Sequence, residues 1–264
     1  MQDSSERSPM EMVASKVPAV TFGFWAIKIL ATTLGETGGD TVSMSMNLGY
    51  LSSTFIFLGI LVVLVVAQIV ANRFNPWLYW ATIIASTTAG TTMADFATRS
   101  LGIGYAGGSA ILLTSVIGVL LIWQLSEKSI SVGTVNSPRV EIFYWAAITV
   151  SQTLGTALGD WMADDAGIGF LGGAGVFAAA LGVVAALYFW TAISRALLFW
   201  AAFILTRPLG ATVGDFLDKP LDHGGLAFSR PVATAVLGAL ILAGILFLPQ
   251  KAGSHPGKSQ TPAP

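Results

Sequence analysis

The chain has 264 residues, of which 54% are hydrophobic and only 10% charged, and its formal net charge is −1. Soluble domains average about 25% charged residues, so the composition indicates a membrane protein whose main partner is the lipid bilayer. A charge near zero argues against a nucleic-acid partner, because nucleic-acid binding needs a basic surface. With no cysteine and two histidines, the chain also excludes disulfides, thiol catalysis and His-rich metal sites.

In chain order, residues 1–18 are polar and predict a disordered cytoplasmic tail, and residues 250–264 predict a second one. Between them lie eight apolar stretches, each close to the roughly 20 residues that cross a bilayer. We therefore predict an all-α membrane protein with eight transmembrane helices. The stretches are residues 19–40, 50–72, 77–97, 107–125, 141–163, 168–190, 195–217 and 230–249.

One pattern recurs in every second stretch: Trp, then Ala at +1, Gly at +10, Gly or Ala at +14 and Asp at +15. The copies are residues 25–40, 80–95, 145–160 and 200–215. Each copy precedes one nearly uniform apolar stretch, so the repeat unit is a two-helix hairpin, and the even number of spans makes all four units parallel.

The Asp-to-Asp intervals are 55, 65 and 55 residues, which places the additional residues between the second and third repeats. We expect residues 126–140 to form a cytoplasmic linker between two four-helix halves, residues 19–125 and 141–249.

Basic loop residues predict the orientation. Eight lie on the side of both termini, and three lie on the opposite side: Arg99, Lys219 and Arg230. The positive-inside rule then predicts cytoplasmic termini and places the four repeat Asp residues at the outer helix ends. The repeat Trp residues, each preceded by Phe or Tyr, are expected to be interfacial anchors.

Two neighbouring faces of each repeat helix carry different residues, because an α-helix turns about 100° per residue. Positions +10 and +14 have the small-xxx-small spacing that lets membrane helices approach closely. We expect helix packing from Gly35, Gly39, Gly90, Gly155, Gly159, Gly210 and Gly214.

The second face is polar at +7, +11 and +15. Unsatisfied polar groups in lipid cost several kcal/mol each, so these ridges should face a shared interior if the repeat helices pack together. A structural role is the alternative, in which each Thr bonds its own helix and each Asp caps a loop. The predicted ion-binding residues are Thr32, Thr33, Thr87, Thr88, Thr91, Gln152, Thr156, Asp40, Asp95, Asp160 and Asp215.

Three further charges break the symmetry of the repeats: Lys28, Glu36 and Arg207. Glu36 and Arg207 would lie at similar depth on neighbouring helices if the repeats close into a ring, and a salt bridge would then offset their desolvation. Alternatively, Glu36 is a coupling carboxylate that titrates during a transport cycle. Pro208 predicts a kink at this depth, because proline removes a helix hydrogen bond.

The segments LGETGGD and LTRPLGATVGD resemble a bacterial family labelled uncharacterised membrane-anchored proteins, and the resemblance covers most of residues 16–249. It implies a multi-pass protein of the bacterial inner (plasma) membrane and no particular reaction. A looser likeness links the chain to small manganese exporters, which set acidic residues in duplicated helices, although this chain departs from their motifs.

The favoured function is transport of a divalent cation of the Mn or Mg type, with Asp40, Asp95, Asp160 and Asp215 as metal ligands. Hard cations prefer such oxygen ligands, and the cation would be a substrate, since no cofactor is expected. The alternatives are a proton-coupled carrier of a small solute, bound by Arg207 and Lys28, and a scaffold or sensor subunit. Without a nucleophile–base pair, no enzyme is expected. The oligomeric state and the direction of transport stay open.

Overall fold

The computed structural model describes residues 15–253. Within this range the chain forms eight long α-helices, and the β-type pairing is confined to one isolated bridge between Pro18 and Ala252. The all-helical prediction is confirmed, and each helix lies close to its predicted range. The helices are α1 (Phe22–Asp40), α2 (Gly49–Val70), α3 (Pro76–Asp95), α4 (Tyr105–Glu127), α5 (Pro138–Asp160), α6 (Gly169–Trp190), α7 (Arg195–Asp218) and α8 (Arg230–Phe247).

Local sequence sets the helix ends. The Asn75 side chain caps α3 by accepting the backbone N–H of Trp77 at 3.0 Å, and Pro76 fills the first turn, where its missing N–H costs nothing. The first three repeat Asp residues are followed directly by a π-helical turn, namely Thr41–Ser45, Phe96–Ser100 and Trp161–Asp165. Gly104 then takes a φ of 75°, which suits glycine, and redirects the chain into α4.

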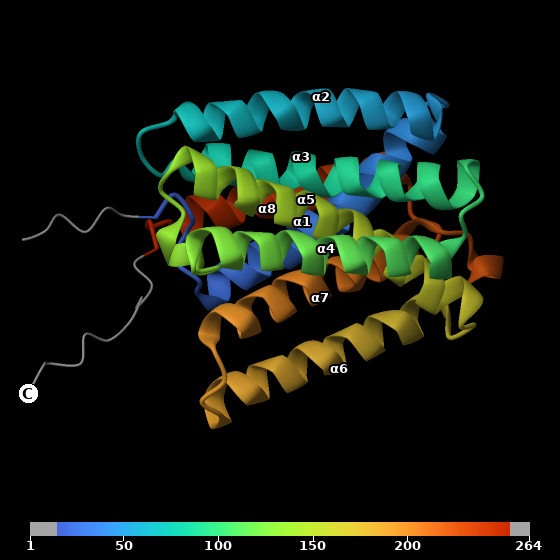
Figure 1. The fold of residues 1–264 in the computed structure, drawn as a ribbon. Helices are drawn as coiled ribbons and strands as arrows, with labels where there is room; N and C mark the ends of the chain where they lie inside the picture. The colour runs from blue at the N-terminus through green and yellow to red at the C-terminus, as the bar shows by residue number, and fades with distance from the viewer. Residues whose placement is uncertain (1–14, 254–264) are drawn as a thin grey trace, which may run out of the picture.

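The four odd-numbered helices close into a ring. Helix α1 packs against α3 and α7, and α5 packs against the same two helices from the opposite side. We call α1, α3, α5 and α7 the inner helices, and the four even-numbered helices the outer helices. The connections between consecutive helices alternate between the two ends of this bundle (Figure 1).

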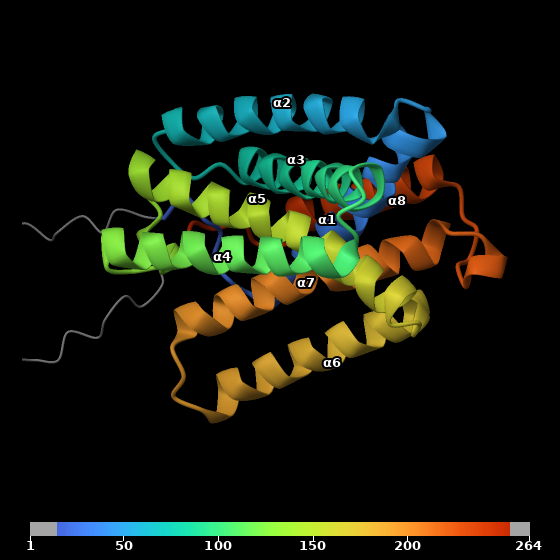
Figure 2. The same ribbon diagram turned by 45° about the vertical axis from the view of Figure 1, so that its right-hand side comes forward.

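Each outer helix covers the inner helix that follows it in the chain, and α8 returns to cover α1. The contacts are α2 on α3, α4 on α5, α6 on α7 and α8 on α1. Both ribbon views show α2 beside α3 and α6 beside α7 (Figures 1 and 2). The two helices of one sequence repeat are therefore not packed on each other, and the predicted hairpin is a unit of sequence rather than of packing. The division into two halves stays a prediction.

Within residues 15–253, five helices are long and apolar enough to cross a membrane: α2, α4, α6, α7 and α8. The apolar windows of α2, α4 and α6 are only 22% buried within the protein, whereas that of α7 is 61% buried. Helices α1, α3 and α5 fall outside this criterion, and their polar ridges, like that of α7, are buried in the ring. The outer surface of the bundle is consequently apolar.

The glycines at +10 lie where the inner helices meet. Each faces the +7 residue of the next inner helix around the ring, and an added Cβ would overlap that residue. At Gly90, for example, the Cβ would come within 2.9 Å of the Gln152 backbone. The four pairs are Gly35 with Thr87, Gly90 with Gln152, Gly155 with Arg207, and Gly210 with Thr32.

Aromatic side chains fill the ring at the end where both described termini lie. Trp80, Trp145 and Trp200 are 1%, 3% and 1% exposed, and Tyr79 and Tyr144 share a hydrogen bond of 2.6 Å between their hydroxyls. The prediction of interfacial anchors is wrong for these three Trp residues. The reason is helical periodicity: position 0 lies on the same face as +7 and +11, so the ring turns it inward as well.

The terminal segments cover this aromatic end. The Lys16 ammonium lies 2.6 Å from a Glu141 oxygen and donates to the Gln68 carbonyl at 3.1 Å, and Val17 is fully buried. The Gly253 N–H donates to the Val17 carbonyl at 2.8 Å. The predicted tails are thus too long at their inner ends, because residues 15–18 and 250–253 belong to the folded bundle. Residues 1–14 and 254–264 lie outside the described residues.

Candidate ion-binding site

The polar ridges line the interior of the ring in successive layers. The +7 residues, Thr32, Thr87, Gln152 and Arg207, are all 0% exposed. The Thr32 hydroxyl lies 3.1 Å from the Thr206 carbonyl on α7, which ties the first inner helix to the last. The predicted shared interior is therefore formed by residues from all four repeats.

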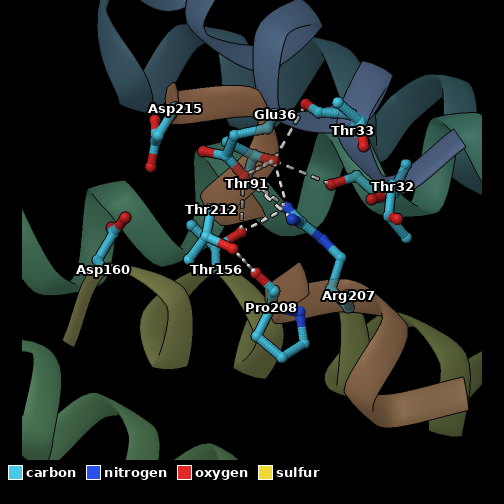
Figure 3. A network of polar contacts seen from close by, with 12 residues as sticks. Thr32, Thr33, Glu36, Thr91, Thr156, Asp160, Arg207, Pro208, Thr212 and Asp215 are labelled. Atoms are coloured by element: carbon cyan, nitrogen blue, oxygen red, sulfur yellow. Dashed lines mark hydrogen bonds and ion pairs between the residues drawn. The ribbon is translucent and has the colours of Figure 1, made fainter. Parts of the chain in front are cut away.

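A central network surrounds the Arg207 guanidinium. Both of its terminal nitrogens lie 3.0 Å from Glu36 Oε2, and one of them donates to Thr91 Oγ1 at 2.6 Å and to Thr156 Oγ1. The side chains of Arg207 and Glu36 are 0% and 3% exposed. The expected ion pair across the α1–α7 contact is present. Figure 3 shows it with Asp160 and Asp215 lying to one side of the network.

Helix α7 stays continuous through this region. It runs from Arg195 to Asp218 with Pro208 inside it, so the proline does not interrupt the helix. The Pro208 carbonyl accepts the Thr212 hydroxyl at 2.9 Å.

Arg99 joins the Asp carboxylates of the second and third repeats. Its Nε lies 3.0 Å from Asp95 Oδ1, and its Nη2 lies 3.2 Å from Asp160 Oδ2. Asp95 and Asp160 are 2% and 1% exposed, whereas the Arg99 side chain is 29% exposed. The arginine therefore lies between these two carboxylates and solvent.

Lys219 joins the Asp carboxylates of the fourth and first repeats in the same way. Its Nζ lies 2.8 Å from Asp40 Oδ2 and 2.9 Å from Asp215 Oδ1. Burial lowers the pKa of the Lys219 ammonium, but Asp215 and Asp40 raise it more strongly, and the net pKa is well above its ordinary value. The lysine side chain is consequently protonated and positively charged at neutral pH.

Arg230 adds a third positive charge at longer range. Its Nε lies 3.6 Å from Asp40 Oδ2 and 3.4 Å from Asp218 Oδ2. Asp218 itself has a fully buried side chain and extends the carboxylate cluster beyond the repeat pattern.

Two groups of three carboxylates could each hold one ion. They are Glu36, Asp40 and Asp95, and Asp40, Asp215 and Asp218, and within each group one oxygen per residue lies within 4.8 Å of the others. Oxygen ligands lie about 2.0–2.6 Å from Mg²⁺ or Ca²⁺, so two ligands of one ion are separated by at most about 5 Å. Asp40 belongs to both groups and is the centre of the candidate site.

Two predicted site residues, one a metal ligand and one a solute-binding charge, lie apart from these groups. Asp160 belongs to neither, although it is buried and shares Arg99 with Asp95. Lys28 lies nearer the aromatic end, with its ammonium 4.1 Å from the Phe203 ring centroid. In the part of the chain that the structure describes, the Lys28 ammonium has no hydrogen-bond partner.

Four other predicted polar residues have packing positions. Thr33 and Thr88 bond the carbonyl four residues earlier in their own helices, at 3.0 Å and 2.8 Å, as the structural alternative proposed. Thr87 Oγ1 and both amide atoms of Gln152 find no hydrogen-bond partner within residues 15–253, and each side chain lies over a glycine of the preceding inner helix.

The sequence interpretation missed Lys219, Arg99, Arg230 and Asp218 as members of the site. It used the three basic residues only to orient the chain. A signal was available for two of them: Arg99 and Lys219 each follow a repeat Asp by four residues, which places both members of each pair on one helical face. The corresponding residues of the first and third repeats are Met44 and Asp164, so only alternate repeats carry a base.

The family described as Repeat of Unknown Function (DUF347) matches the chain four times, over residues 23–74, 78–129, 143–194 and 198–251. Each match covers one inner helix and the outer helix that follows it. No curated protein and no solved structure matches the chain.

Proposed function

The chain belongs to the DUF347 repeat family, and from the ring that its four repeats form we propose that it is a membrane transporter of small divalent cations of the Mn²⁺ or Mg²⁺ type. The observation that carries this proposal is the carboxylate cluster around Asp40, in which two overlapping groups have the spacing of a single-ion site.

The proposal includes eight membrane-spanning helices. Four apolar outer helices cover an inner ring whose helices have 19 to 24 residues, close to the length that a bilayer requires. In such an arrangement lipid meets the outer helices, and polar side chains stay inside. The positive-inside bias and the family resemblance support a bacterial inner membrane location with cytoplasmic termini, which would place the Asp cluster near the outer face.

The donor set supports a hard cation. Asp40 shares its two groups with four other carboxylates, and the chain contains no cysteine that would favour a soft metal. The cation would be transported, so the proposal includes neither a resident cofactor nor a catalytic step.

The charge at this end of the ring supports a divalent ion. When all groups are ionised, five carboxylates face three basic side chains, which leaves an excess of two negative charges. The acids are Asp40, Asp95, Asp160, Asp215 and Asp218, and the bases are Arg99, Lys219 and Arg230. One divalent cation would neutralise that excess. Glu36 and Arg207 already balance each other deeper in the ring.

The test is cation flux into liposomes that contain the purified protein, with Mn²⁺, Mg²⁺ and Ca²⁺ offered with and without a pH gradient. Loss of an outer-shell partner of a metal costs 10–100-fold, so Asp40→Asn should reduce Mn²⁺ flux by at least about tenfold. Asp165→Asn is the control for loss of one carboxylate at the same end of the bundle, because Asp165 is exposed and lies in neither carboxylate group. It should retain at least about a third of the flux.

Two outcomes would contradict the proposal. If folded wild-type protein moves none of the three cations, the scaffold or sensor alternative gains support. If metal movement is absent and a small solute moves only with a pH gradient, the proton-coupled carrier is favoured, with the unpartnered Lys28 as a candidate binding charge.

A further inference from the structure

The Lys219 ammonium lies between two members of one carboxylate group. Asp40, Asp215 and Asp218 are close enough together to share an ion, and the ammonium is 2.8 Å from Asp40 and 2.9 Å from Asp215. A cation held by this group would lie between the same two carboxylates, where it would meet the positive charge of the ammonium. A cation at this place and the lysine side chain therefore exclude each other.

We propose that Lys219 is a tethered cation that occupies the metal position in the ion-free protein, and that its side chain must leave for a divalent cation to bind. The inference rests on the proposed cation transport and deepens it, because it assigns a competitor to that site. The metal replaces an ammonium rather than entering an empty set of carboxylates.

The third carboxylate shows that the lysine satisfies the site only in part. Asp218 has a fully buried side chain, and its Oδ1 has no hydrogen-bond partner in the described residues. Its other oxygen meets only Arg230, at 3.4 Å. A buried carboxylate oxygen without a partner is costly, and a divalent ion between the three residues would satisfy it. The salt bridges of Lys219 within the described residues go to Asp40 and Asp215 and leave this oxygen without a partner.

The backbone at Lys219 is fixed, so the exchange would involve the side chain alone. The Lys219 carbonyl accepts the Ala227 N–H at 2.9 Å, and the loop packs so tightly that a Cβ at Gly225 would lie 2.6 Å from the Lys219 carbonyl carbon. The side chain is 12% exposed, whereas Asp40 and Asp215 are each 1% exposed. The lysine side chain is thus more exposed than the two carboxylates that it joins, and the proposed exchange requires it to swing outward.

Arg99 provides an internal comparison. It bridges Asp95 and Asp160, of which only Asp95 belongs to a carboxylate group, and that group also needs Glu36, which Arg207 holds. If Asp40, Asp215 and Asp218 bind the ion, removing the Lys219 ammonium should change the affinity for the ion much more than removing the Arg99 guanidinium does.

The experiment measures Mn²⁺ affinity of detergent-solubilised full-length protein by isothermal titration calorimetry, using MnCl₂ at pH 8. The variants are Lys219→Met, Arg99→Met and, as a matched control for loss of one charge at the opposite end, Lys251→Met. Close charge pairs couple by at least about 1.5 kcal/mol, so Lys219→Met should bind Mn²⁺ about tenfold more tightly than wild type. Arg99→Met should change the Mn²⁺ affinity less than Lys219→Met does, and Lys251→Met should stay within about threefold of wild type.

A second measurement protects against a misfolded variant. The gain in Tm on adding MnCl₂ should be larger for Lys219→Met than for wild type, and Lys219→Gln should behave like Lys219→Met. If wild type binds Mn²⁺ and both Lys219 variants bind it equally or more weakly, the tethered-cation inference is refuted and the proposed function stands. Tighter binding only in Arg99→Met would also refute it. If neither wild type nor any folded variant binds Mn²⁺, the proposed function itself fails.

Discussion

The buried Glu36–Arg207 pair should be the most sensitive point of the ring. In Arg207→Met, a side chain of similar length still covers Gly155, but the guanidinium is gone. Glu36, whose side chain is 3% exposed, would keep only the Thr91 and Thr156 hydroxyls, each 3.4 Å from its Oε2. Removing one partner of a buried ion pair costs about 3–5 kcal/mol, because the other charge is left uncompensated.

The reverse change should be equally costly. In Glu36→Gln, the shape of the side chain is retained, but the fully buried Arg207 loses its counter-charge. We therefore again expect the free energy of unfolding to fall by about 3–5 kcal/mol. The double variant Glu36→Gln/Arg207→Met leaves no unpaired charge at this place. Its loss should be smaller than either single loss, with a coupling free energy of about 2 kcal/mol or more.

The assay is equilibrium unfolding in mixed detergent and SDS micelles, followed by the intensity of the tryptophan fluorescence. Arg195→Met is the control on the same helix, since Arg195 is exposed and surface changes stay within about 0.5 kcal/mol. If the two single losses simply add in the double variant, Glu36 and Arg207 are not coupled, and the central network has been misinterpreted.

Two further predictions concern packing. Gly155→Ala should cost about 1–3 kcal/mol of stability, because the new Cβ overlaps Arg207 and lies 3.0 Å from the Pro208 nitrogen. Gly182→Ala on α6 is the control and should be neutral, because its Cβ meets nothing within 4 Å. Equal losses in the two variants would contradict the close contact between the inner helices. Lys16→Met should cost about 3 kcal/mol, because it leaves the buried Glu141 unpaired, and Lys16→Met/Glu141→Gln should recover most of that loss. Unchanged unfolding of Lys16→Met would show that residues 15–18 do not stabilise the bundle.

The sequence predicted the helices and the register of the polar ridges well, because both depend on periodicity within one helix. It also predicted the Glu36–Arg207 pair, since the repeats gave the depth of each residue and a ring made them neighbours. It failed for the tryptophans. The interfacial interpretation considered only the position of each Trp at a helix end, although periodicity places it on the same helical face as the polar ridge, which the ring turns inward.

The composition of the carboxylate site could be predicted only in part. Repetition identified Asp40, Asp95, Asp160 and Asp215, but the structure gives these four different partners. Lys219 reaches Asp40 across 179 residues of sequence, and no local pattern encodes that contact. Asp218 lies outside the repeat pattern, so a search by repeat position passes over it.

The shifted packing of the outer helices has a consequence for how the protein is made. Every inner helix except the first emerges from the ribosome after the helix that covers it, whereas α1 waits for α8, the last helix of the chain. Until then Lys28, Glu36 and Asp40 on α1 are not fully enclosed by the other helices. Biosynthesis therefore ends with the event that seals the ring, and a chain that stops after three repeats lacks both neighbours needed for closure, α7 beside α1 and α8 outside it. A product that lacks the fourth repeat should therefore stay incompletely folded. In a circular permutant that begins at α8, every inner helix would be synthesised after the outer helix that packs on it.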